Sequence, residues 1–327
     1  MNRRQFAISL AGLGLAMASG GLFAQEQYPS RPVTLINPFP PGSPVDVVAR
    51  ELAAKLSDRW GQSIIVDNRA GASGTLGASA VVRAKPDGYT LLLTSASTHA
   101  IGPAVRKHLP YDPVNDFTPL AFIGHGPVAI VVHPSVPVNS LDELVQLAKD
   151  KPDTITYASS GVGTILHLTG EVFSQRTGAQ LMHVPYQGAV PAATDLLGGH
   201  VNMMFDSIAN ATPNIRAGKV KALAVIMPQR SPLLPDVPTA AELGYDGLTV
   251  PAWFGLFGPA GLPQNVVQTW EQAVQQVVGD SPEFQARLME LGILAEVKPS
   301  KEFAATIETD IAAMKDVVAK AGIELLE

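Results

Sequence analysis

Four short turns in the sequence combine glycine, serine or threonine with the expected start of a helix, and none of them contains Lys or Arg. They read FPPGSPVD, SASTHAIGP, SSGVGTILH and YQGAVPA. Free backbone N–H groups at a helix start, together with the positive end of the helix dipole, can bind an anion without a cationic side chain. The repetition of this pattern indicates non-covalent binding of a small anion.

The first of these turns carries the signals of a sharply defined helix start. Ser43 is the expected N-cap, Pro44 takes the first helical position, where no N–H is lost, and Asp46 can close a capping box. Taken alone, the turn is better explained as no more than a well-made helix start. The recurrence of the pattern in three other turns favours the binding interpretation.

Patterns for metal, cofactor or covalent chemistry are weak. His167 and Glu171 are four residues apart and could face one metal ion, but no third ligand is in view. The glycines of residues 71–77 lack the spacing of a dinucleotide site, and there is no nucleophile elbow. The sequence contains no cysteine, which excludes disulfides and thiolate chemistry. We expect no metal, no cofactor and no enzymatic activity.

Two residues in or near the turns have two interpretations each. His99, beside Thr98, either donates to a ligand or is a solvated loop residue. Asp206 stands at the end of an expected strand, where it either binds a ligand amine or a water, or caps the helix that follows.

The turns require a scaffold in which strands and helices alternate. Strand-like segments such as 32–39 and 88–97 are followed by helical ones, which favours an α/β fold with mostly parallel sheets and helices on both faces. We expect two lobes, the first made of residues 25–125 and 227–327 and the second of residues 126–226. The connections near 124–126 and 227–251 are rich in Gly and Pro and are the expected hinges.

The N-terminus and the net charge indicate an exported protein. Residues 1–24 have a basic start, a weakly apolar run and a small Ala24, as in a secretory signal peptide, and Arg3-Arg4 also fits a twin-arginine signal; a membrane anchor is the alternative. Removing these residues leaves 21 basic and 29 acidic residues, a net charge of −8. Such a chain is a poor partner for nucleic acid. We expect a periplasmic monomer.

Six segments along the sequence resemble the motifs of the Bug family, the TctC-like substrate-binding receptors of tripartite tricarboxylate transporters. In order they read YPSRPVTLINPFPPGSPVDVVAR, VDNRAGASGTLGA, KPDGYTLLLTSASTHAI, YASSGVGTILHLTGEVF, VPYQGAVPAATDLLGGHVNMMFD and LPDVPTAAELG. The resemblance covers residues from about 28 to the C-terminus. It implies a periplasmic binding protein with a Venus-flytrap fold of the type II-like kind, which holds small carboxylates between its two lobes.

The resemblance also implies that ligand contacts come from the turns of both lobes. The first lobe would contribute Phe39, Gly42, Ser43, Val45, Asp46, Ser97, Thr98 and His99, and the second Ser160, Gly161, Gly163, Thr164, His167, Tyr186, Ala189 and Asp206. The chain departs from the family pattern at Ser43, at Val45 and at Gln187, where the family often has glycine, a small or hydroxyl residue, and a basic residue. These departures favour a ligand with an apolar or ring portion. An acid at position 45 is predicted to fold and to repel an anionic ligand.

The sequence therefore predicts an exported receptor that captures a small carboxylate or carboxamide and delivers it to the membrane permease subunits of a tripartite tricarboxylate-type transporter. Two alternatives stay open. The same fold could report its ligand to a sensor kinase, or the chain could be a periplasmic hydrolase, which would need a nucleophile and base that the sequence does not display.

Overall fold

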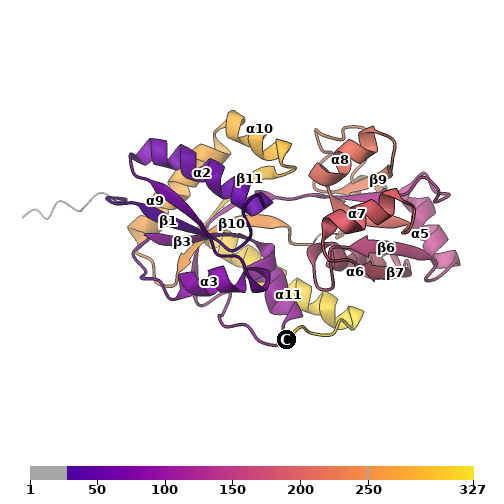
Figure 1. Ribbon diagram of the computed structural model, residues 1–327, viewed down its shortest axis with the longest axis horizontal. Coiled ribbons are helices and arrows are strands. Elements are labelled where there is room, and N and C mark those ends of the chain that lie inside the picture. Colours follow the sequence, from indigo (N-terminus) through magenta and orange to yellow (C-terminus); the bar gives the residue numbers. More distant parts are fainter. Residues whose placement is uncertain (1–27, 249) are drawn as a thin grey trace, which may run out of the picture.

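The computed structural model describes residues 28–248 and 250–327, which form two lobes side by side (Figure 1). The first lobe is built on a six-stranded sheet and the second on a five-stranded sheet. The strands of the first sheet are β1 (Val33–Asn37), β2 (Ile64–Asn68), β3 (Thr90–Ser95), β4 (Phe117–His125), β10 (Trp253–Pro259) and β11 (Leu294–Pro299). Those of the second sheet are β5 (Val128–Val132), β6 (Ile155–Ser159), β7 (Leu181–Pro185), β8 (Met203–Ser207) and β9 (Lys221–Ile226).

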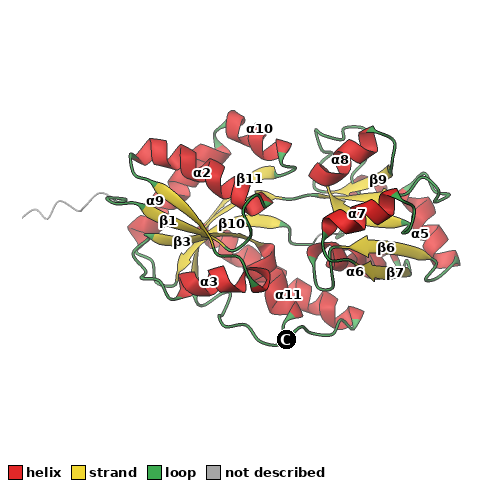
Figure 2. Cartoon of the chain, in the orientation of Figure 1, coloured by secondary structure: helices red, strands yellow, loops and turns green. Residues whose placement is uncertain are grey.

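Helices cover both faces of each sheet, as predicted (Figure 2). The α-helices are α2 (Pro44–Trp60), α3 (Thr75–Val82), α4 (Gly102–Val105), α5 (Leu141–Asp150), α6 (Ile165–Thr177), α7 (Ala189–Leu197), α8 (Ile208–Arg216), α9 (Gln264–Val274), α10 (Pro282–Glu290) and α11 (Ser300–Ala321). Short helical turns lie at η1 (Ala72–Gly74), η2 (Ser97–Ile101), η3 (Ala241–Leu243) and η4 (Gln275–Gly279). The predicted signal peptide, residues 1–24, lies outside the described residues. Across the described ranges, no helix is both long and apolar enough to cross a membrane.

The α/β fold with two lobes is confirmed, but the sheets are mixed and not mostly parallel. The first sheet has the order β11-β4-β10-β3-β1-β2 and the second the order β7-β6-β8-β5-β9. Only β1–β2, β1–β3, β6–β7 and β6–β8 pair in parallel. In the first sheet β10 and β11 run opposite to the other strands, and in the second sheet β5 does. The chain enters β10 and β5 from the other lobe.

The inner strands β3, β10, β5 and β8 are buried on both faces, which explains their nearly continuous apolar sequences. In the first lobe α2, α9 and α10 pack on one face, and α3 and α11 pack on the other. In the second lobe, alternate residues of β5 point to opposite faces: Ile130 and Val132 lie in the cluster with α5 and α6, while Ala129 and Val131 lie in the cluster with α7 and α8.

The chain crosses between the sheets twice, at Gly126-Pro127 and between Met227 and Ala252. The second crossing stays with the second lobe for most of its length. Thr239 forms a parallel bridge to Val225 of β9, and Leu248 and Val250 pack into the core beside α5 and α6. We infer that the second lobe extends beyond the predicted boundary at residue 226, to about Val250.

Candidate functional site

The carboxyl ends of the strands in one lobe face those in the other. β4 runs in the same direction as β1 and β3, because β10 pairs antiparallel with both β3 and β4. After its last residue, His125, the chain passes into the second lobe. There β5 starts at Val128, opposite the last residue of β8, Ser207. The turns that follow β1, β2 and β3 therefore face the turns that follow β6, β7 and β8, which is where ligands bind in such sheets.

The turn between β1 and α2 satisfies its own hydrogen-bonding groups. Ser43 Oγ accepts from the Asp46 N–H at 3.2 Å, which confirms the predicted N-cap. The Asp46 side chain is buried, and its carboxylate accepts hydrogen bonds from the Gly42 N–H, Arg50 Nε, and Nδ2 of Asn68 and Asn37. Burial by itself would raise the pKa of Asp46, but these hydrogen bonds outweigh it and lower the pKa to about 2. The positive end of α2 therefore already carries an anion of its own.

Val45 does not line the predicted site. Its side chain is 5% exposed and packs in the core with Val48, Ala49 and Leu52 of the same helix. The prediction that an acid at position 45 would fold is corrected accordingly. Such an acid would be buried in an apolar cluster, where a carboxylate loses its hydration without gaining a partner.

The turn after β3 buries two of its three predicted contacts. Thr98 Oγ1 lies 2.8 Å from His99 Nδ1 and 2.9 Å from Thr94 Oγ1. The His99 ring is fully buried, stacks on Phe257 with 4.0 Å between ring centroids, and has its pKa lowered to about 3 by burial. The interpretation of His99 as a solvated loop residue is therefore wrong, and its contact with a ligand stays a prediction. Of the three, Ser97 alone is partly exposed.

The turn between β6 and α6 differs from the one before α2, because no side chain among the described residues caps the helix start. Thr164 takes the N-cap position, yet its Oγ1 donates to the Gly161 carbonyl at 2.7 Å and not to α6. The first turn of α6 contains no acid. The N–H groups of Ile165 and Leu166 therefore have no partner within the helix and are available to a ligand or to water. Ser160, Gly161 and Thr164 are partly exposed.

A buried group of polar side chains holds this turn in shape. His167 is 5% exposed, and its Nδ1 accepts from the Gly163 N–H at 3.0 Å. Ser159 Oγ accepts from the Gly161 N–H at 3.1 Å and lies 2.7 Å from His183 Nε2. The two imidazole rings stack with 3.9 Å between centroids, and burial lowers the pKa of His183 to about 4. His167 and Ser159 thus fix the turn from beneath, and the amides of Gly161 and Gly163 are already used.

The remaining predicted residues lie at the ends of β7 and β8. Tyr186 is partly exposed, and its hydroxyl donates to Asp195 Oδ2 at 2.7 Å. Ala189 opens α7, whose start, like that of α6, has no side-chain cap within the described chain. Asp206 is 4% exposed and accepts from the Ser207 N–H, while Ser207 itself caps α8. Burial raises the pKa of Asp206 to about 6.

Comparisons with known proteins identify the family. The sequence pattern of the Tripartite tricarboxylate transporter family receptor matches residues 48–323. The chain belongs to this family. It is 39% identical to Protein BugT of Bordetella pertussis over 262 residues, 79% of this chain and 80% of that protein.

Two solved structures of Rhodopseudomonas palustris proteins extend the comparison to the fold. The structure of Rpa4515 with adipate has a TM-score of 0.77 and 35% identity, and covers 91% of this chain and 100% of that one. The structure of MatC (Rpa3494) with bound malate has a TM-score of 0.72 and 36% identity, and covers 89% of this chain and 100% of that one. This chain therefore has the fold of a solute-binding receptor of the tripartite tricarboxylate transporter family.

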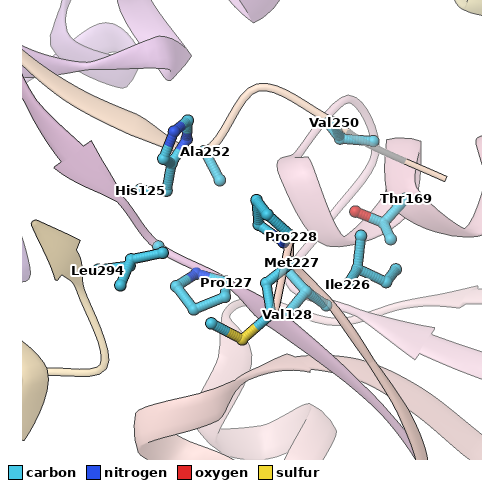
Figure 3. Close-up of a pocket in the computed structure, with 11 residues that line it drawn as sticks. His125, Pro127, Val128, Thr169, Ile226, Met227, Pro228, Val250, Ala252 and Leu294 are labelled. Atoms are coloured by element: carbon cyan, nitrogen blue, oxygen red, sulfur yellow. The ribbon is translucent and has the colours of Figure 1, made fainter. Parts of the chain in front are cut away.

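A small cavity in this receptor lies at the hinge and not among the facing turns (Figure 3). It measures about 80 Å³ and lies between the two crossing segments, with His125 and Ala252 on one side and Thr169 and Val250 on another. None of the predicted site residues lines it. This cavity is therefore distinct from the predicted ligand site.

Sequence reasoning missed Ser159, and it did not predict that His183 lies beside it. His183 lies in β7 directly opposite Tyr157 of β6, and this register stacks the two rings at 4.8 Å. The sequence offers one usable signal, the serine Ser159 at the end of the strand. It does not show that β6 and β7 are neighbours, and only that pairing brings His183 to Ser159.

Proposed function

We propose that this chain is a periplasmic receptor that captures a small carboxylate or carboxamide between its lobes and delivers it to a membrane permease of the tripartite tricarboxylate type. The observation that carries the proposal is the start of α6. It is uncapped, free of acids, and turned towards the first lobe. Two relatives of known structure contain small carboxylates, adipate and malate, which supports the same class of ligand here.

Recognition in this proposal uses backbone dipoles in place of a cationic side chain. The N–H groups of Ile165 and Leu166 and the positive end of the α6 dipole attract one carboxylate, and the start of α7 adds a second set of donors. The start of α2 is a weaker anion site because Asp46 already occupies its positive end. We infer that the second lobe holds the carboxylate and that the first lobe closes over the rest of the ligand.

The location of the receptor and a non-covalent mode of capture follow from the same proposal. The predicted signal peptide, which lies outside the described residues, would place the receptor in the periplasm. Capture would involve no covalent step. The pair of Ser159 and His183 has the composition of a nucleophile and a base, but the Ser159 side chain is fully buried and its hydroxyl is bonded to the Gly161 amide. This geometry favours a structural role for the pair.

The test places a negative charge at the start of α6 without disturbing the fold. Thr164 already has N-cap geometry, and Asp and Asn are both good N-cap residues. We expect Thr164→Asp to fold and to lose binding of adipate and malate by at least about 100-fold in titration calorimetry, because the like charge opposes the ligand carboxylate. The isosteric Thr164→Asn variant should lose about tenfold or less, the value of one hydrogen bond.

A matched control introduces the same negative charge at a helix start that does not face the other lobe. Ser140 is the N-cap of α5, which follows β5 at the far end of its sheet from the facing turns, so Ser140→Asp should bind like the parent. A thermal shift gives a second readout, since a ligand at 100 times its dissociation constant adds about 2.7 kcal/mol to the free energy of unfolding. Unchanged carboxylate binding by Thr164→Asp would show that the ligand does not contact the start of α6.

A further inference from the structure

Three exposed apolar side chains lie in or directly after the turns that face each other. Leu76 is 55% exposed, Val162 is 45% exposed and Val190 is 80% exposed. They are three of eight large apolar side chains that are exposed across the described ranges. Single exposed apolar residues are ordinary on a protein surface. Three exposed apolar residues at the facing turns therefore require an explanation.

These residues occupy equivalent places in the two lobes. The two sheets share an order in which β2 and β7 are edge strands, and β1 and β6 are the strands next to them. Phe39, which is partly exposed, follows β1, and Val162 follows β6. Leu76 comes after β2, in α3, and Val190 comes after β7, in α7. Each lobe therefore presents two apolar side chains at the end of the same pair of strands.

The polar side chains of the same turns are largely engaged within the protein. Thr164 donates its hydroxyl proton to the Gly161 carbonyl, and Tyr186 donates its proton to Asp195. Three of these turns contain neither Lys nor Arg, and Arg69, at the start of the turn after β2, pairs with the Asp67 carboxylate. A hydroxyl group on the body of a ligand would meet apolar side chains there, and burying an unpaired hydroxyl is costly.

We propose that the natural ligand is a carboxylate with an apolar body, alkyl or aryl, and that Leu76, Val162 and Val190 select it over hydroxylated acids of the same length. This inference rests on the proposed function, which supplies the carboxylate. The apolar body lies against these three side chains and Phe39 when the lobes close, and the α6 start holds the charged end. The proposal thereby narrows the ligand class to carboxylates whose carbon chain carries no hydroxyl groups.

The test uses two pairs of six-carbon acids that differ only in their hydroxyl groups. Hexanoate is compared with gluconate, and adipate with galactarate, by titration calorimetry on the protein from residue 28 onward and on the full chain without its signal segment. Within each pair we expect the acid without hydroxyls to bind at least about tenfold more tightly, the effect of one buried, unpaired hydroxyl. Its binding should also show the negative heat-capacity change of apolar burial.

Variants locate the effect in the proposed residues. Val190→Ser and Leu76→Ser should each weaken adipate or hexanoate about fivefold to tenfold, the effect of losing one buried aliphatic side chain, and should leave the hydroxylated acids unchanged or slightly improved. Val114→Ser is the matched control. Val114 is 36% exposed and precedes β4, at the end of the first sheet away from the facing turns, so its replacement should change neither pair.

The outcomes separate this inference from the function on which it rests. Equal or tighter binding of gluconate and galactarate would overturn the apolar ligand and leave a carboxylate receptor. Weakening by Val114→Ser as large as that by Val190→Ser would overturn the assignment of residues. Failure of all four acids to bind, with the fold intact, would overturn both proposals together.

Discussion

At the scale of single residues, the two lobes treat similar helix starts in opposite ways. Both α2 and α6 follow the strand next to the edge of a sheet, β1 and β6, and begin with a hydroxyl residue at the N-cap position. In α2 the hydroxyl of Ser43 caps the helix and Asp46 neutralises its positive end, whereas in α6 the hydroxyl of Thr164 turns back to its own loop. A single acid in the first turn thus decides which helix start is open to an anion.

The burial of Val45 gives a prediction at the same scale. Val45→Asp places a carboxylate among apolar side chains of the first core, and we expect the free energy of unfolding to fall by about 3 kcal/mol or more. Urea unfolding followed by circular dichroism measures it. Val162→Asp is the control, because Val162 is exposed and the same charge there should change stability by about 0.5 kcal/mol or less. Equal stability of the two variants would contradict the burial of Val45.

At the scale of elements, α6 is positioned by a close contact with β6. Gly170 of α6 faces the ring of Tyr157, and a β-carbon added at Gly170 would lie 2.3 Å from that ring. Tyr157 is fully buried, and its hydroxyl donates to Glu171 at 2.7 Å. The ring has no room to move aside. The close approach of α6 to β6 depends on the absence of a side chain at position 170. The position of the α6 start depends on it as well.

Gly170→Ala is therefore predicted to destabilise the protein although alanine favours helices. The helix propensity gained is about 1 kcal/mol, and forcing a methyl group into a packed interface costs about 1–3 kcal/mol. We expect a net loss of about 1 kcal/mol in the free energy of unfolding and a measurable weakening of carboxylate binding, because α6 is displaced. In a Tyr157→Leu background the same change should cost less, as a double-mutant cycle would show. A stabilised Gly170→Ala variant would mean that α6 does not pack this closely.

At the scale of the whole molecule, the lobes are joined by more than the two crossing segments. α11 belongs to the first lobe, yet Met314 and Val318 near its end pack into the core of the second lobe, and Gln175 of α6 donates to the Val317 carbonyl at 3.1 Å. Figure 1 shows α11 running along both lobes. On the facing side, Val105 of the first lobe lies beside Gly163 of the second. We expect these contacts to restrict the relative motion of the two lobes.

Ligand capture should make the molecule more compact. We expect small-angle X-ray scattering to show a smaller radius of gyration at saturating adipate than without ligand, because donors and apolar contacts for one ligand are divided between two lobes. The Thr164→Asp variant, measured at the same adipate concentration, should show no change. A parent protein that binds adipate with an unchanged radius of gyration would show that capture does not involve closure.

Much of this architecture follows from local sequence, because local interactions decide it. The serine caps of α2 and α5, the alternation of strands and helices, and the absence of Lys and Arg from the strand-end turns are properties of short segments. They are sufficient to predict an α/β fold and to locate the turns that matter. The division into two lobes is also visible, since the connections between them are rich in Gly and Pro.

The tertiary structure decided what depends on neighbours distant in the sequence. The antiparallel insertion of β5 and β10 results from a chain that changes lobes, and no residue within either strand records that path. Val45 and His99 stand in turns that read as ligand contacts, but the helices and strands packed around them bury both side chains. Ser159 meets His183 only because β6 and β7 are paired. Burial and strand pairing are set by the packing of whole elements, and a turn sequence does not contain that packing.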